Sequence, residues 1–149
     1  MTDSSGKSLL LVEDNTDDLE LALRAFKLNN LPHDVQIARD GSEALDRLLG
    51  RTGSAPLPTV VLLDLNLPKV DGLTVLKRLR ADARTALLPV VILTSSSEQV
   101  DLVASYRNGA NSFVRKPVSF GDFVVTMRRI AGYWLSLNQT PEPGDTSTN

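Results

Sequence analysis

The chain has 149 residues and a mass of 16.2 kDa, which suits one domain of ordinary size with a substantial core. It contains no cysteine, which excludes disulfide bonds and thiolate metal sites, and its formal net charge is -2 with basic residues dispersed along the chain. No basic region followed by an apolar stretch begins the chain, and no window approaches the ~20 apolar residues that span a bilayer. We therefore expect a cytoplasmic protein that binds neither nucleic acid nor a membrane directly.

The predicted elements alternate between short apolar runs of strand length and longer segments with helical periodicity. In chain order they are Leu9–Val12, Asp17–Leu28, Val35–Ala38, Ser42–Leu49, Thr59–Leu63, Leu73–Ala83, Pro89–Leu93, Glu98–Asn108, Ser112–Val114 and Phe120–Leu137. Because parallel strands need crossover helices, this alternation predicts a doubly wound α/β fold with five strands in a mostly parallel sheet and five helices. Residues 1–7 and 138–149 offer almost nothing to bury, so we expect disorder there and one ordered domain over 8–137.

Acidic residues follow two of the predicted strands. Glu13 and Asp14 come directly after the first strand, and Asp64 follows the third. In an open α/β sheet ligands bind at the carboxyl ends of the strands, and crowded carboxylates there favour a hard divalent cation such as Mg²⁺. Glu13 and Asp14 fit a helix cap as well as a metal site. Asp64 does not open the next helix, since Asp71 is the better N-cap, so its metal or chemical role is the stronger prediction.

A hydroxyl and an ammonium group follow the last two predicted strands. The serines after Thr94 fit a capping box formed by Ser95 and Glu98, which leaves Thr94 at the strand tip, where its hydroxyl could donate to a phosphoryl oxygen. Lys116, before Pro117, reads on its own as a solvated loop residue. Its place on the same edge as the acids favours pairing with carboxylates and phosphoryl oxygens instead.

The order Glu13-Asp14, Asp64, Thr94, Lys116-Pro117 resembles the receiver domain of two-component response regulators over about residues 8–137. The resemblance implies a flavodoxin-like fold with the strand order 2-1-3-4-5. It also implies a phosphoryl group transferred from a sensor histidine kinase to Asp64. The roles it implies for other residues are Mg²⁺ ligation by Asp14, Asp64, the Asn66 main-chain carbonyl and, through water, Glu13; phosphoryl contacts by Thr94 and Lys116; a switch made of Thr94 and Phe113; and a cis peptide bond between Lys116 and Pro117.

A narrower resemblance is to stand-alone regulators that accompany phytochrome-type sensor kinases. It depends on Leu11–Asn15, on Gly109–Val114 and on Tyr133-Trp134-Leu135. It implies a bacterial phytochrome as the kinase. Only a short polar segment follows Leu137, so we expect the output to be a protein contact or a relay step.

Three other functions compete with that of a phosphoacceptor. A phosphohydrolase with an aspartate nucleophile normally needs a second acid two residues later, where this chain has Asn66, so at most slow self-dephosphorylation is expected and the chain is not predicted to be an enzyme. A dinucleotide-binding module would need a Gly-x-Gly-x-x-Gly loop, which does not follow the first strand. A receiver-like interaction module without phosphorylation remains the main alternative.

The last predicted helix carries an apolar stripe that continues to Leu137 and is longer than the strands beneath it. We expect its final two turns to overhang the sheet and to form a homodimer through Tyr133, Trp134, Leu135 and Leu137. The alternative is that Trp134 folds back onto its own domain.

Overall fold

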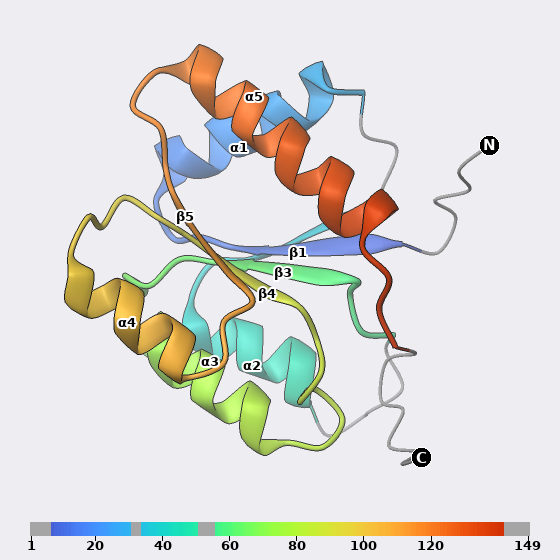
Figure 1. Cartoon of the computed structure of the whole chain (residues 1–149), viewed down its shortest axis with the longest axis vertical. Coiled ribbons are helices and arrows are strands. Elements are labelled where there is room, and N and C mark those ends of the chain that lie inside the picture. The colour runs from blue at the N-terminus through green and yellow to red at the C-terminus, as the bar shows by residue number, and fades with distance from the viewer. Residues whose placement is uncertain (1–6, 31–33, 51–55, 142–149) are drawn as a thin grey trace.

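The computed structural model describes residues 7–30, 34–50 and 56–141. Within these residues five strands form one parallel sheet in the order β2-β1-β3-β4-β5, so the predicted fold class and strand order are confirmed (Figure 1). In chain order the elements are β1 Ser8–Val12, α1 Thr16–Leu28, β2 Asp34–Ala38, α2 Gly41–Leu49, β3 Val60–Leu63, α3 Gly72–Ala81, β4 Val90–Thr94, α4 Gln99–Arg107, β5 Ser112–Arg115, α5 Phe120–Gly132 and a π-helical turn, η1, at Tyr133–Leu137.

The three inner strands are apolar throughout because helices cover both faces of the sheet. β3 and β4 are buried at every position, and β1 is buried at every position after Ser8. The register places Leu9 beside Val60 and Val61 beside Val90, so the carboxyl ends of the strands meet at one edge. That edge is where candidate site residues lie.

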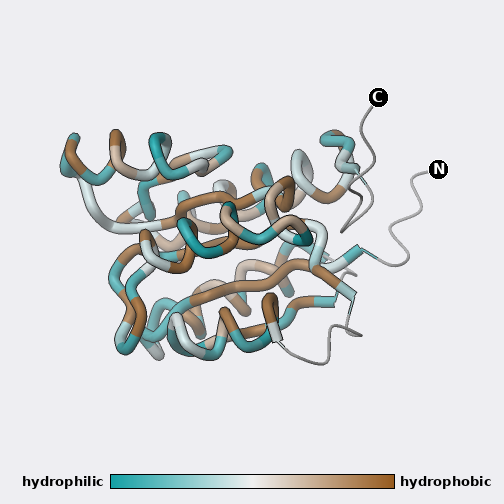
Figure 2. Tube along the Cα trace, turned by 90° about the horizontal axis from the view of Figure 1, so that it is seen from below, coloured by the Kyte–Doolittle hydropathy of each residue, from teal (hydrophilic) through white to brown (hydrophobic). Residues whose placement is uncertain are grey.

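Successive side chains of each strand point to opposite faces, which divides the core in two. Leu9 and Leu11 of β1 pack with α1 and α5, whereas Leu10 and Val12 pack with α2 and α3. Figure 1 shows α1 and α5 together on one face of the sheet and α2, α3 and α4 on the other. In Figure 2 the hydrophobic colour runs along the strands between these helical layers.

Short polar side chains begin most helices. Asp40, Asp71 and Ser119 each accept a hydrogen bond from a main-chain NH three residues later, and the cap at Asp71 was predicted. The predicted Ser95–Glu98 capping box is wrong. Glu98 is the N-cap of α4 and makes no side-chain cap bond, while Ser96 Oγ accepts from the Glu98 NH and bonds to Asp101. The chain therefore enters α4 later than a box beginning at Ser95 would allow.

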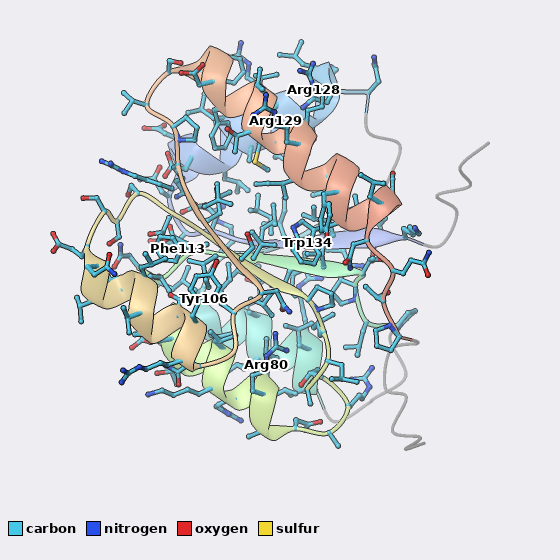
Figure 3. The ribbon with its side chains drawn as sticks, in the orientation of Figure 1. Arg80, Tyr106, Phe113, Arg128, Arg129 and Trp134 are labelled. Carbon is cyan, nitrogen blue, oxygen red and sulfur yellow. The ribbon has the colours of Figure 1, made fainter. Side chains whose placement is uncertain are left out.

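The last helix departs from the predicted continuous α-helix. α5 ends at Gly132, and the Asn138 NH donates to the Tyr133 carbonyl across a π turn. A π turn uses more residues per turn, so each residue rotates less about the axis and Leu135 stays over the face that carries Ala131. Leu135 is 1% exposed and Trp134 packs against the same core, where Figure 3 shows it at the end of α5 beside the strands.

The predicted exposure of all four C-terminal apolar residues is therefore wrong for Leu135, and Trp134 is only partly exposed. Tyr133 and Leu137 are 48% and 74% exposed. The rings of Tyr133 and Trp134 form a T-shaped pair with centroids 4.9 Å apart.

The predicted disorder at both ends falls mostly on residues 1–6 and 142–149, which lie outside the described ranges. Lys7, which the prediction also included, donates to the Leu135 carbonyl at 2.7 Å and so connects the start of β1 to η1. Among the described helices, none combines the length and apolar character of a membrane span.

Candidate functional site

The candidate site lies at the carboxyl edge of the sheet, toward the left in Figure 1. Ladder hydrogen bonds fix the main chain there. The Asp64 NH donates to Val12 O at 3.2 Å, the Glu13 NH to Ala38 O at 3.0 Å, and the Lys116 NH to Thr94 O at 2.7 Å. Residues that are far apart in the sequence are thereby held side by side at the strand ends.

The structure brings the three predicted acids together. One carboxylate oxygen from each of Glu13, Asp14 and Asp64 lies within 4.8 Å of the other two. Glu13 and Asp64 are 3% and 7% exposed, whereas Asp14 is exposed to solvent. The cluster is thus a partly buried set of oxygen ligands with one open side.

Lys116 joins this cluster from the end of β5, as predicted from its position. Its ammonium Nζ lies 2.6 Å from Glu13 Oε1, 3.0 Å from Asp64 Oδ2 and 2.9 Å from Asp18 Oδ2. The Lys116 side chain is 9% exposed, so these are largely desolvated ion pairs. The ammonium group holds the two buried carboxylates at hydrogen-bonding distance.

Asp18 was not among the predicted site residues. It lies in the first turn of α1, where an acidic residue is ordinarily explained by the helix dipole. Asp18 lies four residues after Asp14, but Asp14 precedes α1, so helical periodicity does not relate the two side chains. The spacing therefore does not distinguish Asp18 from the adjacent Asp17.

Burial changes the proton affinities of this cluster. Burial raises the pKa of Glu13 from its ordinary 4.5 to about 7, against the opposing effect of Lys116 and with a further increase from the charge of Asp64. Burial alone would lower the pKa of Lys116, but its hydrogen bonds with Glu13 and Asp18 and the charge of Asp64 outweigh burial and raise that pKa. Lys116 is therefore a permanent cation in this site.

The other predicted residues surround Asp64. The Asn66 NH donates to Asp64 Oδ1 at 3.2 Å. Thr94 is fully buried at the tip of β4, and its Oγ1 accepts from the Ser96 NH at 3.3 Å. Phe113 of β5 lies beside Ile92 in the register and is partly buried against the α2–α3 side of the core (Figure 3). The roles predicted for Asn66 O, Thr94 and Phe113 stay predictions.

The prediction of a cis peptide bond between Lys116 and Pro117 is wrong. No peptide bond among the described residues is cis. The trans form is favoured for X–Pro bonds by about 0.5–1 kcal/mol. Lys116 reaches all three carboxylates from a trans bond, so the site geometry does not require the cis form.

The donor set fits a hard divalent cation. The clustered ligands are carboxylate oxygens without histidine or cysteine, which suits Mg²⁺, Mn²⁺ or Ca²⁺ rather than a softer metal. Glu13 and Asp64 are buried, and the single charge of Lys116 offsets only part of their negative charge. A cation bound between these carboxylates would offset the rest. The structure thus contains an acidic group that could bind a metal.

Comparison with known proteins agrees with this geometry. The family model described as the response regulator receiver domain matches residues 9–128. The chain is 44% identical over 136 residues to the probable methanogenesis regulatory protein FilR2 of Methanothrix harundinacea, covering 91% of this chain and 88% of that protein. It is 35% identical to response regulator Rcp1 of Synechocystis, covering 95% of this chain and 99% of Rcp1.

Solved structures give the same result. The phosphorylated cyanobacterial phytochrome response regulator RcpA matches with a TM-score of 0.85 and 36% identity, covering 91% of this chain and 99% of RcpA. The Mn²⁺-bound form of Rcp1 matches with a TM-score of 0.82 and 35% identity, covering 91% and 99%. Receiver domains are phosphoacceptors that work with histidine kinases and are not generally classed as enzymes. The chain belongs to the response regulator receiver family and is a two-component response regulator that resembles stand-alone phytochrome-associated members.

Proposed function

We propose that Asp64 accepts a phosphoryl group from the phosphohistidine of a sensor kinase. The observation that carries this proposal is the ion pair between Lys116 Nζ and Asp64 Oδ2, 3.0 Å long, inside a cluster of carboxylates at the carboxyl edge of the sheet. The Lys116 ammonium group is a counter-charge for the Asp64 carboxylate, and a carboxylate is a nucleophile that needs no general base. The name of RcpA describes a phosphorylated relative with the same fold.

In the proposed reaction an Asp64 oxygen forms a bond to phosphorus while the bond from phosphorus to the histidine nitrogen breaks. The histidine leaves with the bonding electron pair, and the product on the protein is an acyl phosphate. Asp14, Asp64 and the Asn66 carbonyl, together with Glu13 through a water molecule, would hold Mg²⁺, which supplies charge neutralisation at the phosphoryl oxygens. Lys116 would bind one of those oxygens, and Thr94 another, so most of the acceleration comes from positioning and electrostatics.

Intact-mass measurement with Mg²⁺ and acetyl phosphate tests the proposal. The wild type and an Asp46→Asn control on α2 should each gain the mass of one phosphoryl group, and Asp64→Asn should not. No gain in the wild type would favour the interaction module without phosphorylation. Release of phosphate over many turnovers would favour the hydrolase, whereas we expect only slow self-dephosphorylation because Asn66 cannot act as the second acid.

The proposed output is a switch from Thr94 to Phe113. A phosphoryl group on Asp64 adds about -1.5 to -2 charge next to the end of β4. The Thr94 hydroxyl would then leave the Ser96 NH to bind a phosphoryl oxygen, and Phe113 on the adjacent strand would repack. In ¹³C-labelled protein, phosphorylation should shift the Phe113 ring signals in the wild type and in Thr94→Ser but not in Thr94→Ala. Equal shifts in Thr94→Ala would contradict the switch.

The proposed kinase is a bacterial phytochrome. This rests on the description of RcpA as a phytochrome response regulator, whereas the name of FilR2 describes a probable regulator of methanogenesis. Such a kinase phosphorylates itself from ATP, so we propose that the reaction takes place in the cytoplasm. Phosphoryl transfer from a purified phytochrome kinase that exceeds transfer from an unrelated histidine kinase by more than about tenfold in kcat/KM would support the assignment. Equal transfer would refute it.

We also propose a homodimer through η1, now restricted to the two apolar side chains that remain exposed. Tyr133 and Leu137 are 48% and 74% exposed within a single turn, and Trp134 borders them. Isologous pairing of two copies would cover both side chains. Sedimentation at micromolar concentration should give a dimer for the wild type and a monomer for the double variant Tyr133→Ser, Leu137→Ser. A wild-type monomer, with or without phosphorylation, would refute the dimer.

A further inference from the structure

Asp18 is the one partner of the Lys116 ammonium group, among the described residues, that does not belong to the candidate metal cluster. Lys116 contacts three carboxylates, and two of them, Glu13 and Asp64, also belong to the group of acids that could hold a cation. Asp18 contacts Lys116 at 2.9 Å from a different element, α1. The ammonium group is therefore held both by the strand ends and by the helix.

A divalent cation and the Lys116 ammonium compete for the same oxygens. A cation bound by Glu13, Asp14 and Asp64 withdraws negative charge from two of the Lys116 contacts and also repels the ammonium group. The Asp18 contact is the one that this competition leaves intact. Without it, the long and flexible lysine side chain would be free to leave the site when it is needed beside the phosphoryl group.

Hydrogen bonds through Asn15 fix Asp18 relative to the acids. Asn15 Oδ1 accepts the hydrogen bond from the Asp18 NH at 2.9 Å, and the Asn15 NH donates to Glu13 Oε2 at 3.1 Å. One residue thus connects the acid cluster to the turn of helix that carries Asp18. The Asp18 side chain is 38% exposed, against 9% for Lys116, so it holds the ammonium group from the solvent side.

We infer that Asp18 is a positioning residue, which keeps Lys116 at the edge of the site while a divalent cation occupies the carboxylates and so prepares it for the incoming phosphoryl group. This inference rests on the proposed function of Asp64. The ordinary explanation of an acid in the first turn, the helix dipole, applies equally to the adjacent Asp17. Asp17 is exposed and makes no ion pair or side-chain hydrogen bond with the described part of the chain, so it is a matched control.

The direct test observes the Lys116 ammonium group by ¹H–¹⁵N NMR, with Mg²⁺ and without any phosphodonor. A buried, ion-paired ammonium exchanges slowly with water, and its signal is assigned by its loss in Lys116→Arg. We expect the signal in wild type and Asp17→Asn both with and without Mg²⁺. In Asp18→Asn it should disappear when Mg²⁺ is added, and Asp18→Glu should restore it. A signal that persists in Asp18→Asn with Mg²⁺, or that is missing from the wild type, would overturn the inference.

A kinetic measurement gives the consequence for phosphorylation. At saturating Mg²⁺ and acetyl phosphate, the maximal rate of phosphoryl uptake should fall about two- to tenfold in Asp18→Asn. This is the size expected for the loss of an ion pair in which Lys116 is buried and Asp18 is partly exposed. The donor concentration that gives the half-maximal rate should change little. Asp17→Asn should match the wild type. Equal maximal rates in the two variants would overturn the inference. A wild type that takes up no phosphoryl group would defeat the proposed function instead, and the NMR result would still decide the role of Asp18.

Discussion

Lys116 connects the buried carboxylates of the site with a partly exposed one. Its ammonium group contacts buried Glu13, buried Asp64 and partly exposed Asp18 at distances from 2.6 to 3.0 Å. The three contacts raise its pKa, so the group is charged near neutral pH. It serves as a fixed positive charge beside Glu13, whose pKa is raised by burial.

The raised pKa of Glu13 predicts how stability depends on pH. Burial raises this pKa to about 7, so between pH 4.5 and 7 folded Glu13 binds a proton that unfolded Glu13 has lost. The contribution of Glu13 to the free energy of unfolding is therefore lost as pH rises through that window. Glutamine does not titrate, so the free energy of unfolding of Glu13→Gln minus that of the wild type should increase by about 1–3 kcal/mol from pH 5 to pH 8. Urea denaturation in EDTA measures both values. A difference that stays constant with pH would contradict the raised pKa.

The site residues that could be predicted from the sequence are those that lie at the end of a strand. Glu13, Asp14, Asp64, Thr94 and Lys116 each follow or end a strand with a clear apolar pattern, and the structure brings them to one edge. Asp18 was missed because its contact with Lys116 depends on the rotation of α1 against β5, which no local pattern records. The cis bond at Lys116-Pro117 was inferred from family resemblance alone, and the local sequence had no signal for it.

Glycine at the start of α3 allows the helix to approach the strand that carries Asp64. A Cβ at Gly72 would lie 2.3 Å from the Asp64 carbonyl oxygen and 2.7 Å from Leu65 Cα. Gly72→Ala should therefore destabilise the fold by about 1–3 kcal/mol and slow phosphoryl uptake, because Asp64 must shift. Gly121→Ala, with nothing within 4 Å of the new Cβ, should instead stabilise α5 by about 0.5–1 kcal/mol.

Chemical denaturation and intact-mass uptake on the same two variants check this contrast. A Gly72→Ala protein as stable and as active as Gly121→Ala would show that the close approach is not required.

Arg80 connects the loop at residues 85–88 with the loop at residues 109–111, at the opposite edge of the sheet from the site. From the end of α3 its guanidinium donates to the carbonyls of Thr85, Ala86 and Leu88, to the Gly109 carbonyl and to Asn111 Oδ1, at 2.8 to 3.2 Å (Figure 3). Lysine has three donors on one nitrogen and cannot span these acceptors. Arg80→Lys should lower the free energy of unfolding by about 2–4 kcal/mol in urea titrations, because buried carbonyls lose charged donors.

Arg78 of the same helix is exposed and provides the control. Arg78→Lys should change stability by less than about 0.5 kcal/mol. Similar losses in both variants would mean that the Arg80 contacts add little.

Helix ends were predictable to different degrees. Asp40, Asp71 and Ser119 are caps in the structure because a short polar side chain before an apolar periodic segment is a local signal. The end of α5 was not predictable from its apolar stripe, since the π turn at Tyr133–Leu137 depends on how Leu135 packs in the core and on the Lys7 contact with its carbonyl. Both are tertiary contacts.

At the scale of the whole molecule, the alternation of strands and helices determined the layers. Two core clusters on opposite faces of one parallel sheet follow from apolar strands that must be covered on both sides. The strand order required family resemblance, because alternation alone does not choose among the right-handed arrangements. The same architecture keeps the carboxylate cluster open on one side, where a phosphodonor could approach Asp64.

The measurement that tests the central claim most directly is reductive trapping of the acyl phosphate. Borohydride reduces an aspartyl phosphate to homoserine, so tandem mass spectrometry of the treated protein locates the acceptor residue. After incubation with Mg²⁺ and acetyl phosphate, homoserine should appear at position 64 and at no other aspartate, and omission of Mg²⁺ should abolish it. Homoserine at a different position, or an unmodified Asp64 in protein that has gained phosphoryl mass, would contradict the account.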